Sequence, residues 1–378
     1  MKFDGKPYTR DQLERYEATL ESIARVRVAE LQEGAERGIR VIEFRNGTGL
    51  AFEVLVERAM DIGSASFRGR EFAWHSGTGF RHPGLHEYSD EEGLSWLRSF
   101  SGLTVTAGLD HTLFTTVSDA SHHHYPHRPT VWNGLHGRVS NLPARLLGHG
   151  VEERDDALVL WAEGEIAQAA VFGEHLKLVR RIECDADGNE IRLIDRVRNF
   201  GFDRQPHMYL YHINFGWPLV DEGTRFVAPV RETTWQSDSV EAQGVSNTVM
   251  PGPQPAFVEQ VYEHTLGADP DGTTSAMLIN DLERWAVEVS WNTNAFPHFF
   301  QWLHLREGAY AVAVEPSTNA VLGRSAAEAD GSLIWLEHGE ERVYETRIAI
   351  HEGNDSIDSA EQLARSRADA AATGDTTE

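Results

Sequence analysis

Cysteine is nearly absent from this chain of 378 residues, and Cys184 is the only one. A single cysteine excludes an intramolecular disulfide and leaves no C-x-x-C pair for dithiol chemistry. The sequence also lacks a G-x-S-x-G motif and a glycine-rich phosphate loop followed by lysine, so hydrolase and nucleotide-binding functions have no motif to support them. No apolar run approaches the roughly 18 residues of a membrane-spanning helix.

Positive charge is scarce, and lysine occurs only at positions 2, 6 and 177. The formal net charge is -25 and the sequence pI is about 5.1, which argues against nucleic acid or an anionic membrane as a partner. The first twenty residues are charged and lack an apolar core, so they do not read as a secretory signal. Together with the lone cysteine, this predicts a cytoplasmic protein that handles a small ligand.

Short runs rich in Val, Ile and Phe, broken by Gly and Asn-Gly, dominate the sequence after Gly38 and predict an all-β fold. We expect a large antiparallel β-sandwich formed by one domain at 38–355. Residues 1–37 are predicted as an N-terminal helical extension, with a helix at 8–24. Residues 356–378 are predicted as a mostly disordered tail that starts with a short helix near 358–367. The predicted strands lie at 139–147, 157–163, 166–171, 175–184, 190–198, 207–215, 225–230, 275–280, 284–290, 299–305, 310–315, 333–337 and 342–351.

Three segments are expected to be irregular, at 75–99, 118–135 and 231–273, and long loops on a β scaffold commonly carry binding surfaces. The second contains four histidines, His122, His123, His124 and His127. Consecutive strand residues face opposite ways, and this spacing is not that of a structural zinc site. A solvated loop is therefore favoured over a metal site for this cluster.

The segment QPHMYLYHINFGWP at 205–218 is predicted as a buried strand. Strand side chains alternate, so His212 and Asn214 share one face, while Tyr209, Tyr211 and their neighbours face an aromatic layer. A polar pair on an apolar strand needs hydrogen-bond partners or a ligand. Taken alone, this pattern favours a core histidine.

A second strand, within AYAVAVEPSTNAVLG at 309–323, places Ala311, Ala313 and Glu315 on one face. Small residues ending in a carboxylate suit the floor of a pocket, because alanine leaves space for a ligand. A salt-bridged carboxylate at a strand end is the simpler alternative. His212 lies on another apolar strand and is a candidate acid to match Glu315 as the base. This match favours a functional site.

Other candidates lie in glycine-rich segments. His136 stands between glycines, where the backbone can approach a ligand closely, although an ordinary turn also fits. Asp110 and His111 follow a strand end and could bind sugar hydroxyls, or Asp110 could stabilise a turn. Arg98 could reach a ligand or be solvated.

Three motifs occur in order along the chain: LHG at 135–137, HINFG at 212–216 and VEPSTN at 314–319. In this order the chain resembles the aldose 1-epimerase, or galactose mutarotase-like, superfamily. The resemblance implies a large β-supersandwich, with His136 binding substrate, His212 as the catalytic acid and Glu315 as the catalytic base. The segment 299–303 resembles the strand before the family's glutamate, which adds Gln301 and Trp302 as substrate-binding candidates.

The stretches ERAMDIG, AWHS, GLTVTAGLDHT and LHGRVSNLPA are similar to the DUF4432 branch of that superfamily, over roughly residues 10–355. The motifs depart from the superfamily's LHGG and HxYFNL. The family's substrate-contacting arginine has two candidates here, Arg98 and Arg58.

The leading hypothesis is an isomerase that interconverts the anomers of a free sugar by acid/base ring opening. The alternatives are a ketose or keto-sugar isomerase or epimerase that uses the same pocket, and a non-catalytic carbohydrate-binding domain. No cofactor is expected, although a divalent metal, a homodimer and the phosphorylation state of the sugar are left open. We expect a polar pocket that keeps the pKa of His212 near neutrality and Glu315 ionised, with Trp302, Trp217 and Phe215 supplying an apolar face.

Overall fold

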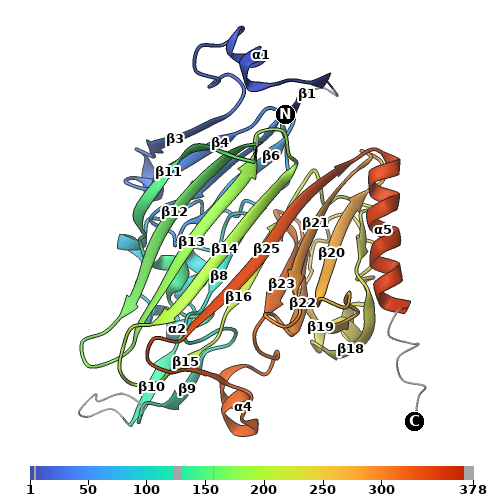
Figure 1. Cartoon of the computed structure of the whole chain (residues 1–378). Helices are drawn as coiled ribbons and strands as arrows, with labels where there is room; N and C mark the ends of the chain where they lie inside the picture. The colour runs from blue at the N-terminus through green and yellow to red at the C-terminus, as the bar shows by residue number, and fades with distance from the viewer. Residues whose placement is uncertain (4–5, 122–128, 156, 370–378) are drawn as a thin grey trace.

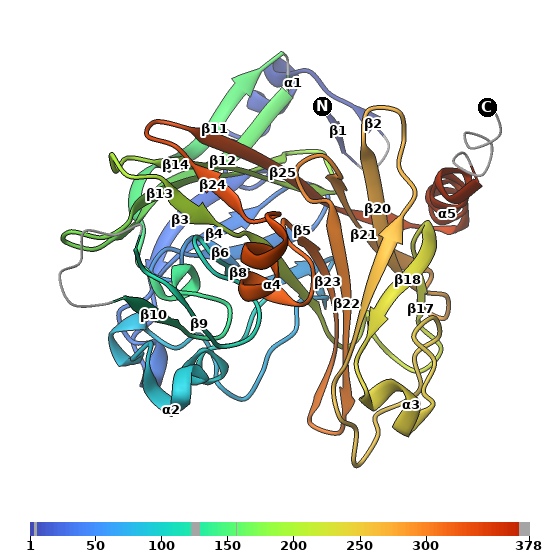
Figure 2. The ribbon, with the colours of Figure 1, turned by 90° about the horizontal axis from the view of Figure 1, so that it is seen from below.

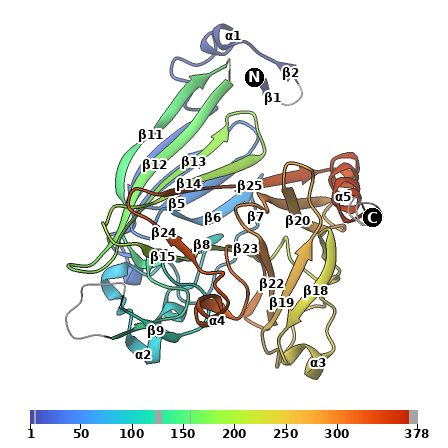
Figure 3. The ribbon, with the colours of Figure 1, turned by 60° about the horizontal axis from the view of Figure 1, so that its bottom comes forward.

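The computed structural model describes residues 1–3, 6–121, 129–155 and 157–369. Figures 1 to 3 show a chain dominated by antiparallel strands, with helices at its edges. The histidine cluster at 122–124 and 127 and the final residues of the tail lie outside the described residues, so the predictions made for them are untested.

Three sheets form the body of the protein, all with antiparallel neighbours. The eight-stranded sheet has the order β11 (Arg145–Arg154), β12 (Ala157–Ala169), β13 (His175–Asp185), β14 (Glu190–Asn199), β25 (Glu341–Glu352), β21 (Trp285–Asn292), β20 (Thr273–Asn280) and β17 (Arg225–Val227). The six-stranded sheet has the order β18 (Val230–Gln236), β19 (Gln260–Leu266), β22 (His298–Arg306), β23 (Ala309–Ser317), β16 (Leu210–Phe215) and β8 (Thr104–Ala107). The five-stranded sheet consists of β3 (Arg25–Glu30), β4 (Arg40–Arg45), β5 (Leu50–Leu55), β6 (Asp61–Phe67) and β7 (Arg70–Glu71).

The smaller elements surround these sheets. Three strand pairs are β1 (Lys2–Phe3) with β2 (Lys6–Pro7), β9 (Thr116–Asp119) with β10 (Thr130–Asn133), and β15 (Gln205–His207) with β24 (Ile334–Leu336). The helices are α1 (Arg10–Glu14), α2 (Asp90–Gly93), α3 (Ser239–Gln243), α4 (Gly323–Asp330) and α5 (Asn354–Asp369), and short 3-10 turns lie at Gly34–Glu36, Pro83–Leu85, Ser95–Arg98 and Val139–Asn141. In Figure 1, α2, α4, β9 and β10 all lie toward the lower end of the molecule.

A single large apolar cluster joins the three sheets, which is the arrangement expected of a sandwich. It takes Ile42 and Val54 from the five-stranded sheet, Leu160 and Ile348 from the eight-stranded sheet, and Ile213 from the six-stranded sheet. The predicted all-β antiparallel fold is therefore confirmed.

A charged network lies in this core behind β16. The guanidinium of Arg180 is fully buried and pairs with Asp61 and Asp195, at 2.7 Å in each case. The hydroxyls of Tyr209 and Tyr211 also donate to Asp195. Because Arg180 and Asp195 belong to the eight-stranded sheet and Asp61 to the five-stranded sheet, the network ties the back of β16 to both of these sheets.

Several sequence predictions were wrong about the ends and loops. The helix predicted at 8–24 spans only Arg10–Glu14, where Thr9 caps it, and residues 25–30 of the supposed extension form β3. The segments 118–135 and 231–273 contain strands β9, β10, β18 and β19. The short helix predicted near 358–367 is present but longer, because α5 spans Asn354–Asp369, so much of the tail predicted as disordered is helical. Arg367 in its last turn donates to Asp269 and Ser275.

Candidate functional site

Strands β16 and β23 are neighbours, and their register explains how two predicted site residues meet. Asn214 is paired with Ala313, and Ile213 with Val314. Continuing this antiparallel register by two residues places His212 opposite Glu315, with both side chains on one face of the sheet. The other face of β16 carries Tyr211, Ile213 and Phe215 into the main core, as the alternation predicted.

The His212 and Glu315 side chains touch in a buried setting. His212 Nε2 lies 3.2 Å from Glu315 Oε1, and each side chain is only 4% exposed. Among the described residues, neither Glu315 Oε1 nor His212 Nδ1 has a hydrogen-bond partner of good geometry. Buried polar atoms without partners cost about 1–3 kcal/mol each, so the contacts within the protein do not fully satisfy this pair.

The pair lies at the bottom of a cavity of about 450 Å³. Aromatic rings surround His212, with centroids at 4.7 Å for Phe100, 5.3 Å for Trp302 and 6.0 Å for Trp96. The remaining walls are mostly aliphatic or aromatic as well. The cavity is lined by Trp74, Leu94, Trp96, Leu97, Phe100, Leu113, Phe114, Leu135, His136, His212, Glu259, Val261, Trp302, His304, Ala309, Glu315 and Val321.

This apolar wall overturns the prediction of a polar pocket, and with it the predicted charges. Burial lowers the pKa of His212 to about 3, with a smaller opposing effect from Asn214. Burial, helped by the negative charge of Glu259, raises the pKa of Glu315 well above its usual range. Both shifts favour the uncharged forms, a neutral imidazole and a protonated carboxyl group.

His136 reaches the same cavity from a tight turn. Its ring centroid lies 5.8 Å from that of His212 and 4.5 Å from that of Trp96. Its own φ is +56°, and the next residue, Gly137, has φ +76°. A Cβ on Gly137 would lie 2.4 Å from the carbonyl oxygens of Gly108 and His111, so only glycine lets this turn pack so closely.

The histidine of this turn is held uncharged. Burial lowers the pKa of His136 well below its usual range, and the nearby imidazole of His212 adds to the effect. Its Nδ1 has no hydrogen-bond partner among the described residues. A neutral imidazole can donate one hydrogen bond and accept another, which suits a sugar hydroxyl.

Trp302 and Gln301 are adjacent on β22 and therefore face opposite ways. Trp302 lines the cavity, and its indole N–H donates to Glu259 at 3.0 Å. Gln301 points away from the cavity, where it donates to the Asn247 carbonyl and lies 3.1 Å from His264 Nε2. The structure thus brings Trp302 to the site but not Gln301.

Asn214 shares the face of His212 but does not line the cavity. Its amide donates to the carbonyl oxygens of Gly102 and His212, both at 3.1 Å. These bonds fasten β16 to the chain that precedes β8. Phe215, in the core, and Trp217, largely exposed, also lie away from the cavity, contrary to the prediction for their rings.

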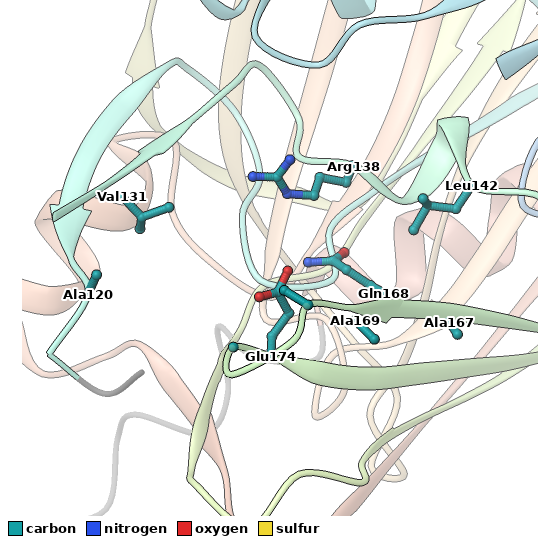
Figure 4. Close-up of a pocket in the computed structure, with 10 residues that line it drawn as sticks. Ala120, Val131, Arg138, Leu142, Ala167, Gln168, Ala169 and Glu174 are labelled. Atoms are coloured by element: carbon teal, nitrogen blue, oxygen red, sulfur yellow. The ribbon is translucent and has the colours of Figure 1, made fainter. Parts of the chain in front are cut away.

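Asp110 and His111 lie beside the site rather than in it. Gln168 Nε2 donates to Asp110 Oδ1 at 2.6 Å, and the same Gln168 side chain helps line a second cavity of about 330 Å³ (Figure 4). His111 is fully buried, its Nε2 is 2.9 Å from the Phe114 carbonyl, and burial lowers its pKa to about 4. These contacts shape the loop that carries Phe114 to the cavity mouth.

Neither arginine candidate faces the cavity. Arg98 is 62% exposed and pairs with Glu91 at 2.6 Å. Arg58 is buried, and its guanidinium donates to the carbonyl oxygens of Ser140, Arg81 and Ser99. Arg58 therefore ties together the two segments that supply Trp96, Phe100 and His136, instead of contacting a ligand.

Sequence reasoning missed two groups of lining residues. The first group is aromatic: Trp96 lies in the segment 75–99, which was predicted as irregular, and Trp74 and Phe100 flank it. Glu259 precedes β19 in a segment that was also predicted as irregular, and no motif marks it. It adds a second carboxylate, at the cavity mouth.

The described residues hold no group of three or more His, Cys, Asp or Glu side chains placed to bind a metal ion. No described helix combines the length and apolar character needed to cross a bilayer.

Comparison with known proteins identifies the scaffold. A family model described as "Domain of unknown function (DUF4432)" matches residues 36–350. No curated protein matches the chain in sequence. A candidate aldose 1-epimerase from Klebsiella pneumoniae has a similar structure, with a TM-score of 0.82 at 19% identity, covering 93% of this chain and 88% of that one.

Two more distant structures share the fold. A galactose 1-epimerase from Lactobacillus acidophilus gives a TM-score of 0.55 at 12% identity, covering 88% of this chain and 100% of that one. A galactose mutarotase-like protein from Clostridium acetobutylicum gives 0.58 at 12% identity, covering 88% and 99%. At these identities the likeness establishes the fold, which is an all-β sandwich of the galactose mutarotase-like type.

Proposed function

The chain belongs to the DUF4432 family, and on that premise we propose that it interconverts the anomers of a free sugar by acid/base ring opening at His212 and Glu315. One observation carries the proposal: two groups that can exchange protons touch at 3.2 Å on the floor of a cavity, and each keeps an atom unpaired. The shared fold with proteins described as aldose epimerases supports the same chemistry.

Ring opening requires two proton transfers at neighbouring oxygens. The anomeric hydroxyl loses a proton, the ring oxygen gains one, the bond from C1 to the ring oxygen breaks, and a C1 carbonyl forms. After rotation about C1–C2, the same transfers in reverse close the ring on its other face. The ring oxygen and the anomeric hydroxyl oxygen are both bonded to C1, so a proton donor and a proton acceptor that touch each other can serve both oxygens.

The burial of the pair assigns the first step. Because burial shifts both pKa values toward the uncharged forms, we propose that protonated Glu315 donates to the ring oxygen while neutral His212 accepts the anomeric proton. This is the reverse of the roles implied by the family resemblance. The resulting imidazolium and carboxylate lie in contact, and their attraction in a low-dielectric cavity limits the cost of separating charge.

The walls suit a sugar ring. Trp302 and Phe100 present apolar surface to ring C–H bonds, and His136 offers a hydrogen bond to a hydroxyl.

The test is anomer exchange, measured by NMR exchange spectroscopy on a panel of reducing sugars. We expect Glu315→Gln and His212→Asn each to slow exchange by about 10²–10⁴-fold. Glu345→Gln, at an exposed position of β25, serves as the matched control. If both site variants exchange anomers as fast as the control, the assignment of the pair is wrong.

Running the same assay in D₂O separates the competing chemistry. Mutarotation places no deuterium on carbon, whereas a ketose or keto-sugar isomerase would do so. Binding without exchange in the wild-type protein would instead identify a carbohydrate-binding domain.

A further inference from the structure

The cavity that holds His212 and Glu315 carries no cationic side chain: among the described residues, no lysine or arginine lines it. Two carboxyl groups line it, Glu315 on the floor and Glu259 at the mouth. A phosphate or carboxylate on the ligand would find no arginine or lysine to pair with in this cavity and would lie near these acidic groups, which disfavours an anionic ligand.

The polar groups that line the cavity are few and partly committed. His304 Nδ1 is 2.7 Å from the Ala309 carbonyl, and the indole of Trp96 donates to the Ser140 hydroxyl. The indole of Trp302 is bound to Glu259. The groups with free hydrogen-bonding capacity are therefore concentrated at the floor, on His136, His212 and Glu315, with Glu259 at one side of the mouth.

Apolar side chains from both sides of β8 in the sequence are exposed at the edge of the cavity. Leu94, Leu97 and Phe114 line the cavity and are also exposed, by 41%, 50% and 58%. Exposed apolar side chains gathered at one place usually mark a binding surface. The side chains of His212 and Glu315 are only 4% exposed, so a ligand that contacts both the pair and these three residues turns its reacting carbon toward the pair and its other end toward the apolar side chains.

We infer that the ligand is an uncharged sugar in which an apolar group replaces a hydroxyl at the end away from the anomeric carbon, that is, a deoxysugar such as a 6-deoxyhexose. Two features carry the inference: the cavity lining has no lysine or arginine, and the mouth formed by Leu94, Leu97 and Phe114 is apolar. It rests on the proposed function for the orientation of the sugar, with its anomeric carbon at the floor. Sugar phosphates and sugar acids are disfavoured by the same features.

The experiment compares sugars that differ only at C6. Isothermal titration calorimetry measures binding of D-fucose, D-galactose, D-galacturonate and D-galactose 6-phosphate to the full-length protein, and the L-fucose and quinovose series cover other ring configurations. We expect the 6-deoxy sugar of the preferred series to bind about tenfold more tightly than its hydroxymethyl parent, because no hydroxyl is buried unpaired. The acid and the phosphate should bind at least about a hundredfold more weakly than the 6-deoxy sugar.

A positive charge at the cavity mouth should shift the binding preference toward the anionic sugars. Leu97→Arg should weaken binding of the 6-deoxy sugar and strengthen binding of the 6-phosphate, so that the ratio of their dissociation constants shrinks by about tenfold or more. Leu282→Arg makes the same change at a turn between β20 and β21, where leucine is 83% exposed, and should leave the order unchanged.

The outcomes for the two proposals are separable. Tight, ordered binding without anomer exchange would support the inference and overturn the proposed function. Anomer exchange with equal or better use of the phosphate or acid would overturn the inference alone. Absence of binding by every neutral sugar, or an order unmoved by Leu97→Arg, would also overturn it.

Discussion

The protonation of the buried pair can be read from how stability changes with pH. The perturbations are His212→Asn and Glu315→Gln, which remove one titrating group each and keep side chains of similar size. If the folded protein holds His212 neutral and Glu315 protonated, the two variants should alter the pH dependence of unfolding in opposite directions.

For His212 the folded and unfolded chains differ in proton binding over the pH range from its ordinary pKa of 6.5 down to the folded value of about 3. In that window the unfolded chain binds a proton that the folded chain excludes, so the stability that His212 contributes is present above pH 6.5 and is lost as pH falls. With these two pKa values, the wild-type protein should lose ~2 kcal/mol between pH 8 and pH 5 relative to His212→Asn.

For Glu315 the direction is reversed. Above its ordinary pKa of 4.5 the unfolded chain releases a proton that the folded chain retains. Its contribution is complete below pH 4.5 and is lost as pH rises. The wild-type protein should therefore lose stability between pH 5 and pH 8 relative to Glu315→Gln.

Urea unfolding at pH 5, 6, 7 and 8, followed by tryptophan fluorescence, measures the difference in unfolding free energy between the wild-type protein and each variant. A charged imidazolium–carboxylate pair would raise the pKa of His212 and lower the pKa of Glu315. The His212 slope would then reverse, because stability would be lost as pH rises above 6.5, and Glu315 would contribute almost no slope above pH 5, where its carboxyl group is ionised in both the folded and the unfolded chain. A reversed slope for His212 together with a flat one for Glu315 would refute the assignment of the proton to Glu315 and restore the roles implied by the family resemblance.

Two further predictions concern the scaffold around the site. Arg180→Met should lower the unfolding free energy by about 3–5 kcal/mol, because it leaves Asp61 and Asp195 buried without their cation. The control is Arg196→Met on β14, where the arginine is 55% exposed, and it should lower the unfolding free energy by less than about 1 kcal/mol in the same urea titration. Equal losses in the two variants would contradict the role given to the network. Gly137→Ala should lower Tm by much more than Gly69→Ala does. Both glycines have φ near +78°, but only at Gly137 would the added Cβ press against two carbonyl oxygens. Similar decreases in Tm in a calorimetric scan would show that the turn can relax.

The strands could be predicted from the sequence because their signal is local. Alternation with period 2 placed His212 on one face of β16 and Tyr211 on the other, and the small residues Ala311 and Ala313 marked the cavity face of β23. The same rule also excludes the predicted placement of Gln301 and Trp302 in one site. Adjacent residues on a strand cannot share a face, so Gln301 and Trp302 could not both have lined one cavity.

The walls could not be predicted because they depend on contacts between distant segments. Trp96 and Phe100 reach His212 from a loop whose position is held by Arg58, through carbonyl oxygens far along the chain. The protonation of the site follows from these walls. An imidazole and a carboxyl group at the same separation in a wet pocket would form an ion pair, whereas this ring of indole and phenyl groups withholds the solvation that both charges need. In the proposed reaction, the residues around the pair therefore set which of the two groups donates the first proton. A wall variant that admits water, such as Phe100→Ser, should move the pKa of His212 back toward 6.5 without changing either member of the pair.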